Sequence, residues 1–141
     1  MPGRSRTNPP PRRHRLLVVD DEAYNVELVA RTFHRTATVL PAADRAQAEA
    51  VLAAEPIDVA LIDYRLDGPR AGLGTCGLDL ARVVRARRPG AAIAMITGFA
   101  DDPALAEALA AGVIDALIAK PWAPVELRRQ VEALLAGAAA P

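Results

Sequence analysis

Short apolar runs alternate with stretches of helical periodicity from residue 15 to near the end of the chain. A run such as RLLVVD, which is apolar and ends in acids, predicts a strand buried on both faces. The intervening stretches space their apolar residues three and four positions apart, as Val26, Val29 and Phe33 do, and this predicts amphipathic helices. The predicted strands are 15–20, 37–42, 57–63, 91–97 and 113–119. The predicted helices are 23–35, 44–56, 78–90, 101–112 and 123–137.

Local signals mark several of the predicted ends. Asp44 is a suitable N-cap for the second helix, and Pro41 closes the strand before it. Pro103 falls in the first turn of the fourth helix, and Gly112 lies just past its end. The pair Pro89-Gly90 ends the third helix.

Five strands alternating with five helices predict an α/β fold, a doubly wound parallel sheet with helices on both faces. Right-handed crossovers leave few topologies, and the flavodoxin-like order 2-1-3-4-5 leads for a chain of 141 residues. We expect a single domain over residues 15–136, with a basic, proline-rich and disordered arm at 1–14 and a short tail at 137–141.

Chemically capable side chains stand where the predicted strands end. Such side chains follow four of the five strands: Asp20-Asp21, Asp63, Thr97 and Lys120. In the predicted order these four strands are neighbours, so their carboxyl ends share one edge of the sheet, where such folds gather functional groups. Lys120 is also the only lysine among 17 basic residues.

Three carboxylates at one edge repel each other and favour a bound cation. Oxygen ligands with room for water suit Mg²⁺, which can bring a phosphoryl group to a carboxylate nucleophile. The charge that develops on the phosphoryl oxygens then needs donors, and Lys120 and the Thr97 hydroxyl are placed to supply them. A compact ammonium fits a small site better than the wide fork of an arginine. Pro121, directly after the lysine, can fix the backbone there through a cis bond.

The fragments LLVVDDE, ALIDYRL, MITGFAD and IAKPW resemble, in order and spacing, the receiver domains of bacterial response regulators. The resemblance covers about residues 15–136 and leaves out only the two tails. Each fragment alone is weak, because a capped helix start or an ordinary turn would explain it. All four at the strand ends of an alternating chain make the resemblance specific.

The resemblance implies a role for each matching position. Asp63 resembles the phosphoacceptor, Asp21 the direct Mg²⁺ ligand and Asp20 its water-linked companion. Arg65 matches the position whose backbone carbonyl completes the metal shell. Thr97 resembles the switch hydroxyl that follows the phosphoryl group.

Two further positions complete the implied set. Lys120 resembles the lysine that pairs with the acceptor carboxylate and then with the phosphoryl oxygen. Gly98 matches the small position that leaves access to the site.

The chain departs from the family pattern in three places. The Gly-rich stretch 64–77 is extended, and we leave open whether it covers the site, contacts a partner or is a tolerated insertion. Leu117 stands where receivers usually carry an aromatic residue, so the familiar coupled rotation of a ring is in doubt. Arg65 is large and charged beside the site, where it could hinder water or recruit a partner.

The bulk composition narrows the setting. The net charge is zero, but five arginines and no acid lie in the first fifteen residues. That arm could contact nucleic acid or an acidic partner, yet it lacks aromatic residues and a helical pattern, so a solvated leader is favoured and nucleic acid is not expected. No unbroken apolar run is long enough to span a bilayer, which takes about 20 residues. The first fifteen residues contain no apolar stretch, so a secretory signal is not expected there. With one cysteine, a cytoplasmic location without membrane contact is expected.

The leading hypothesis is a stand-alone response regulator and not an enzyme, although it assists its own phosphorylation and dephosphorylation. It would accept a phosphoryl group on Asp63 from a histidine kinase or a histidine phosphotransfer protein. It would then contact a downstream protein through the face formed by the fourth helix, fifth strand and fifth helix. The predicted domain leaves no room for an output domain, and homodimerisation is open.

Three alternatives remain. The chain could be a non-phosphorylated adaptor of the same fold, or a receiver module that belongs to a larger histidine kinase system. A phosphatase that forms an aspartyl-phosphate is disfavoured, because Arg65 stands where such enzymes need a second acid.

Overall fold

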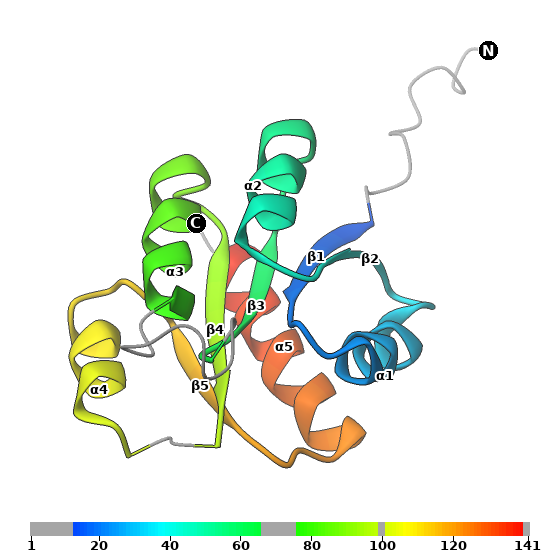
Figure 1. The fold of residues 1–141 in the computed structure, drawn as a ribbon. Coiled ribbons are helices and arrows are strands. Elements are labelled where there is room, and N and C mark those ends of the chain that lie inside the picture. Colours follow the sequence, from blue (N-terminus) through cyan, green and yellow to red (C-terminus); the bar gives the residue numbers. More distant parts are fainter. Residues whose placement is uncertain (1–12, 66–75, 99–100, 140–141) are drawn as a thin grey trace.

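The computed structural model describes residues 13–65, 76–98 and 101–139. The strands are β1 (His14–Val19), β2 (Ala37–Ala42), β3 (Val59–Asp63), β4 (Ala92–Thr97) and β5 (Ala116–Ala119). The helices are α1 (Ala23–Phe33), α2 (Arg45–Ala54), α3 (Cys76–Arg87), α4 (Pro103–Ala110) and α5 (Pro124–Ala139). Strands and helices alternate along the described chain, as the hydrophobic pattern predicts (Figure 1).

The five strands form one parallel sheet in the order β2-β1-β3-β4-β5. In its register Leu16 of β1 lies beside Val39 of β2 on one side and Val59 of β3 on the other. The predicted fold class and strand order are therefore confirmed. The parallel arrangement brings all five carboxyl ends to the same edge of the sheet.

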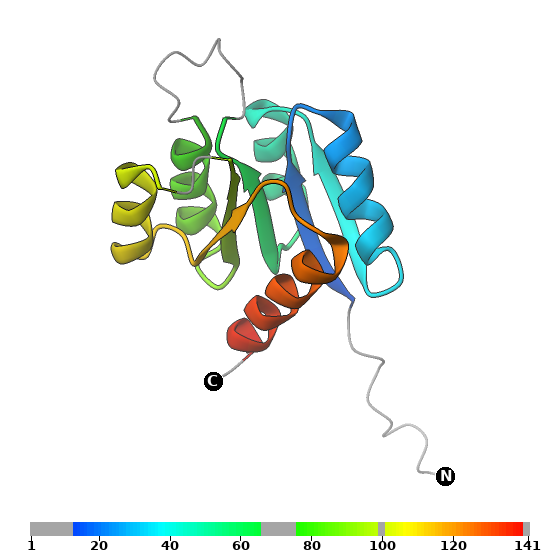
Figure 2. The ribbon, with the colours of Figure 1, turned by 90° about the horizontal axis from the view of Figure 1, so that it is seen from below.

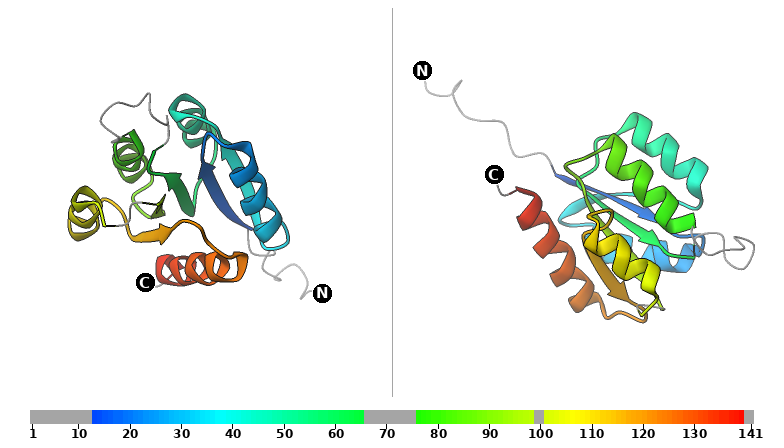
Figure 3. Two further views of the ribbon diagram at one scale, coloured as in Figure 1. Left: turned by 60° about the horizontal axis from the view of Figure 1, so that its bottom comes forward. Right: turned by 90° about the vertical axis from the view of Figure 1, so that its left-hand side faces the viewer.

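Two apolar layers hold the helices on opposite faces of the sheet. Helices α1 and α5 cover one face and bury Phe33 and Leu127 against it (Figure 3). Helices α2, α3 and α4 cover the other face, where Leu52, Leu80 and Leu105 pack. The central strands are buried on both sides, which explains their continuous apolar sequence.

Several predicted end signals are confirmed. The Asp44 carboxylate accepts a hydrogen bond from the backbone N–H of Gln47 at 2.8 Å and caps α2. Pro103 occupies the first turn of α4. Gly112 follows α4 with a φ of 78°, a left-handed conformation that glycine adopts without steric cost.

Several element boundaries and end signals differ from the predictions. Pro41 lies inside β2 rather than closing it, which is tolerated because β2 is an edge strand. Helix α3 begins at Cys76, two residues earlier than predicted, and ends at Arg87. Strand β5 begins at Ala116, not at residue 113, because the Asp115 side chain accepts hydrogen bonds from Ile93 N (2.8 Å) and from Arg85 (2.6 Å).

The outer boundaries of the predicted domain also shift. Strand β1 includes His14, and Arg13 donates hydrogen bonds to the carbonyl oxygens of His34 (2.7 Å) and Ala37 (2.8 Å). The last two residues of the predicted arm are therefore exposed but hydrogen-bonded to the fold, and residues 1–12 lie outside the described part. Helix α5 continues to Ala139, two residues into the predicted tail. Strand β1 begins at the same end of the molecule at which α5 finishes (Figure 2).

Among the described residues, no helix combines the length and apolar character that crossing a bilayer requires.

Candidate functional site

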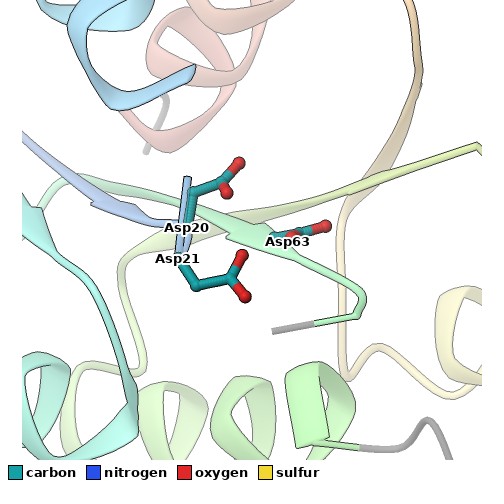
Figure 4. A group of neighbouring side chains, drawn as sticks. All are labelled: Asp20, Asp21 and Asp63. Atoms are coloured by element: carbon teal, nitrogen blue, oxygen red, sulfur yellow. The ribbon is translucent and has the colours of Figure 1, made fainter. Parts of the chain in front are cut away.

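Three carboxylates meet at the carboxyl edge of the sheet. Asp20 and Asp21 follow β1, Asp63 is the last residue of β3, and all three extend into the same space (Figure 4). One oxygen from each lies within 4.8 Å of the others. Asp20 and Asp63 are buried, at 4% and 6% exposure, whereas Asp21 is exposed. The parallel register of β1 and β3 produces this convergence of residues that are 43 positions apart.

Lys120 reaches the same space from the end of β5. Its ammonium nitrogen lies 3.2 Å from Asp63 Oδ1 and 4.0 Å from Asp20 Oδ2. Its backbone N–H donates to the carbonyl oxygen of Thr97 at 2.9 Å, which fixes the end of β5 against that of β4. The Lys120–Pro121 peptide bond is cis.

Asp20 is held by donors from α1. Its Oδ1 accepts a hydrogen bond from Glu22 N at 2.9 Å, and its Oδ2 accepts one from the Asn25 side chain at 3.2 Å. Burial raises its pKa to about 6, and the charge of Asp63 adds to this, while the Glu22 hydrogen bond, Lys120 and Asn25 oppose the rise. Burial and the Asp63 charge also raise the pKa of Asp21.

The donor set fits a small divalent cation. Mg²⁺ binds oxygens at about 2.1 Å in an octahedron, so its ligand oxygens lie about 3 to 4 Å apart. Carboxylate oxygens that lie within 4.8 Å of one another are close enough to hold such an ion, directly or through a water molecule. Three carboxylates beside one ammonium favour a divalent ion. Burial is the main cause of the raised pKa values of Asp20 and Asp21, and the charge of Asp63 adds to both.

The remaining predicted residues surround this cluster. Thr97 ends β4 and is buried, with 2% exposure. Gly98 is exposed, and a methyl group built on it would meet no atom within 4 Å, so the site is open on that side. Arg65 is exposed, and its backbone N–H lies 3.4 Å from Asp63 Oδ1, at the long limit for a hydrogen bond.

The departures from the family pattern have different outcomes. Leu117 is half-buried and packs against the apolar layer between the sheet and helices α2, α3 and α4. No aromatic ring stands at this position. Most of the Gly-rich stretch 64–77 lies outside the described residues, and its role stays open.

Two contacts at the site were not predicted. The first is the Asn25 amide on Asp20; its signal was an amide one turn into the helix that follows the acidic pair. The second is a hydrogen bond of 2.8 Å from the Tyr64 hydroxyl to Asp102 Oδ2. Burial, followed by this bond, raises the pKa of Tyr64 to about 12. The bond also joins the Ala104 N–H in lowering the pKa of Asp102.

The chain matches a known family over most of its length. The model of the response regulator receiver domain matches residues 16–132. Among curated proteins, it is 33% identical over 126 residues to the hydrogenase transcriptional regulatory protein HoxA of Cupriavidus necator, covering 84% of this chain and 24% of that protein. It is 36% identical over 119 residues to the response regulator protein PilR of Pseudomonas aeruginosa, covering 83% and 24% respectively. The chain thus spans about a quarter of the length of these relatives.

Solved structures share the fold. A CheY-like response regulator receiver domain protein from Methanospirillum hungatei superposes with a TM-score of 0.79 at 24% identity, over 90% of this chain and 97% of that one. At this identity the likeness bears on the fold alone.

Proposed function

Because the chain belongs to the response regulator receiver domain family of two-component systems, in which phosphorylation on aspartate is characteristic, we propose that Asp63 accepts a phosphoryl group in a Mg²⁺-dependent reaction. One observation carries this proposal: the Asp63 carboxylate lies 3.2 Å from the only lysine side chain and within 4.8 Å of two further carboxylates. A nucleophile, a cation site and a positive donor thereby surround one point.

The transfer itself is a simple exchange of bonds. A carboxylate oxygen of Asp63 attacks the phosphorus of a phosphohistidine, the O–P bond forms, and the P–N bond breaks. The P–N electron pair passes to the imidazole of the donor, which takes up one proton from solvent. Bound Mg²⁺ supplies neutralisation of charge on the phosphoryl oxygens.

The residues of the chain would hold the ion and donate to the phosphoryl oxygens. Asp21, Asp63 and the carbonyl of Arg65 would ligate the ion directly, and Asp20 would hold it through water. Lys120 would exchange its contact with the Asp63 carboxylate for one with a phosphoryl oxygen. Thr97 would donate its hydroxyl to another, and Gly98 leaves the approach open.

Acetyl phosphate tests this assignment without a protein donor. With Mg²⁺, the intact mass of the chain should rise by one phosphoryl group, and the group should be lost in alkali. Asp63→Asn should abolish the gain, and chelation of Mg²⁺ should prevent it. The matched control is Asp58→Asn, a carboxylate that accepts a hydrogen bond from Arg15 N at the other end of the sheet. Equal labelling of Asp63→Asn and the wild type would refute the proposal.

The proposed partners follow from this chemistry. The proposed donor is a histidine kinase or a histidine phosphotransfer protein. We propose that the chain acts in the cytoplasm as a stand-alone regulator. Its proposed role is that of a signalling acceptor rather than an enzyme. A hollow of about 430 Å³ beside the site, lined by Tyr24, Lys120 and Trp122 among others, gives a protein donor room to approach. Tyr24 is 69% exposed at its rim, which supports docking there.

The output face is proposed as α4, β5 and α5. Leu109 and Val125 are exposed on the two helices, at 41% and 68%. These apolar side chains support binding of a downstream protein or of a second copy of the chain. Equilibrium sedimentation with and without acetyl phosphate distinguishes the two, because only self-association depends on the concentration of the chain alone.

A further inference from the structure

A buried phenol connects the acceptor strand to helix α4. Tyr64 follows Asp63 directly and is only 5% exposed. Its hydroxyl donates to Asp102 Oδ2 at 2.8 Å. Asp102 is the N-cap of α4, and its other oxygen accepts the N–H of Ala104 at 2.9 Å. A single carboxylate therefore starts the helix and receives the phenol.

The donor end of this bond is fixed in the sheet. The Tyr64 N–H donates to the carbonyl oxygen of Ile96 at 2.9 Å, which continues the pairing of β3 with β4. The first turn of α3 presses on the same backbone, because a methyl group built on Gly77 would lie 2.6 Å from the Asp63 carbonyl oxygen and 2.9 Å from Tyr64 Cα. Tyr64 therefore cannot shift without moving a strand or a helix.

The acceptor end is attached to the other side of the site. Thr97 ends β4, and Asp102 follows it by only five positions along the chain. If the Thr97 hydroxyl moves toward a phosphoryl group on Asp63, Asp102 is close enough along the chain to be displaced as well. Asp102 then moves relative to a phenol that stays in place.

The Tyr64 ring lies in the same apolar layer as Leu117, the residue that stands where receivers usually carry an aromatic side chain. Tyr64 belongs to the same buried cluster as Leu105 of α4, and Leu117 packs against that cluster. The position of Leu117 has no ring that could rotate, whereas Tyr64 supplies a ring and a polar bond in contact with α4. An aromatic side chain that contacts α4 thus directly follows the acceptor Asp63.

We propose that Tyr64 is a positioning residue that couples Asp63 to helix α4. Its hydrogen bond to Asp102 holds α4 in the unphosphorylated arrangement, and the bond weakens when Asp63 carries a phosphoryl group. This inference rests on the proposed function of Asp63. By linkage, a bond that favours one state opposes the ligand that favours the other, so losing the bond should make the phosphoryl state easier to reach.

Hydrogen exchange of the full chain tests the coupling, with Mg²⁺ and beryllofluoride as the probe that mimics a phosphoryl group. In free Tyr64→Phe, the amides of residues 104–110 should exchange about tenfold faster than in the wild type, which corresponds to about 1.4 kcal/mol. With beryllofluoride bound, the two proteins should exchange alike. The beryllofluoride concentration at half-saturation should fall in the variant, by up to about tenfold.

Two further variants separate coupling from packing. Asp102→Ser keeps an oxygen that can cap Ala104 but is too short to reach the phenol, so it should behave like Tyr64→Phe. Combining these two substitutions should add little to either single change, because both remove the same bond. Asp44→Ser makes the same type of substitution at the N-cap of α2, where the carboxylate accepts from Gln47 N, and should match the wild type in both states at α4.

The opposite results are equally clear. If Tyr64→Phe speeds exchange of α4 by the same factor in both states and leaves half-saturation unchanged, the bond is merely structural and the coupling is refuted. If the wild type takes no phosphoryl group from acetyl phosphate and does not respond to beryllofluoride, the proposed function fails and the coupling fails with it. The first result leaves the function of Asp63 standing, so the two failures are distinguishable.

Discussion

At the scale of single residues, the site holds more negative charge than its one ammonium can balance. For Asp20, burial raises the pKa to about 6, from an ordinary value of 3.8, and the neighbouring charge of Asp63 adds to the rise. An acid with a raised folded-state pKa stabilises the folded chain at low pH, and this contribution is lost as pH rises through the folded pKa. The metal-free protein should therefore lose stability between about pH 4 and pH 6.

Asp20→Asn should remove that loss. In the presence of a chelator, the free energy of unfolding of the variant should exceed that of the wild type by about 2 kcal/mol at pH 7.5 and should nearly equal it at pH 4. Urea denaturation at the two pH values measures this difference. Asp79→Asn, on the exposed side of α3, is the control and should show no such pH dependence. A constant difference between Asp20→Asn and the wild type would contradict the assigned cause.

Lys120 makes a second prediction at this scale. Its compact ammonium lies 3.2 Å from Asp63 Oδ1 in a space shared with two other carboxylates. Lys120→Arg keeps the charge but brings a planar group that is larger and has different donor directions. Phosphorylation by acetyl phosphate should slow by at least about tenfold, which intact-mass time courses measure. A variant that labels at the wild-type rate would show that charge alone suffices.

At the scale of elements, the acceptor strand and helix α3 meet without space for a side chain. Gly77 lies in the first turn of α3 against the backbone of Asp63 and Tyr64. This contact restrains the backbone of Asp63. The hydrogen bond from the Lys120 N–H to the Thr97 carbonyl oxygen likewise restrains the end of β5. The site is therefore positioned by close backbone packing as well as by side chains.

Gly77→Ala should disturb this contact. Its methyl group would meet backbone atoms at 2.6 to 2.9 Å, which cannot yield as a flexible side chain would, so the variant should lose about 2 kcal/mol of stability. Gly137→Ala in α5 meets nothing within 4 Å and should gain up to about 1 kcal/mol from helix propensity. Denaturant titration of both variants measures the contrast. Equal effects at the two positions would show that α3 can move away from the backbone of Asp63 and Tyr64 at no cost in stability.

The elements also show what the sequence can predict. The strands and their order follow from the apolar runs, and the convergence of Asp20, Asp63 and Lys120 follows from parallel strands sharing an edge. The start of α3 does not, because a stretch rich in glycine predicts a loop. The pairing of Tyr64 with Asp102 joins residues 38 positions apart that follow the neighbouring strands β3 and β4, and no local sequence signal marks it.

At the scale of the whole molecule, the two types of basic residue do different work. Several arginines donate to carbonyl oxygens at helix ends and in turns away from the site. Arg13 does so at His34 and Ala37, Arg128 at Thr32, and Arg88 at Leu52 and Glu55. In Arg13 and in Arg88 one terminal nitrogen donates to both carbonyl oxygens, and a guanidinium is more weakly hydrated than an ammonium, which favours such contacts. Lys120, in contrast, places a compact charge beside the Asp63 carboxylate.

Arg88→Lys tests this division. Loss of the two-carbonyl contact at the end of α2 should lower the free energy of unfolding by about 1 kcal/mol while leaving Mg²⁺ affinity unchanged. Arg129→Lys, in an exposed pair with Glu126, should change stability by less than about 0.5 kcal/mol. Thermal melts and calorimetric titration with Mg²⁺ provide the two measurements. A shift in Mg²⁺ affinity for Arg88→Lys would show that the two ends of the sheet are not independent.

A solitary lysine also gives the molecule a built-in chemical handle. The Lys120 side chain is 29% exposed, so a reagent that acylates or reductively methylates primary amines can attack only this residue and the amino terminus. Occupation of the acceptor by a phosphoryl group would shield that amine. The extent of modification at one peptide would therefore report the signalling state of the protein directly, without a radioactive label or an antibody.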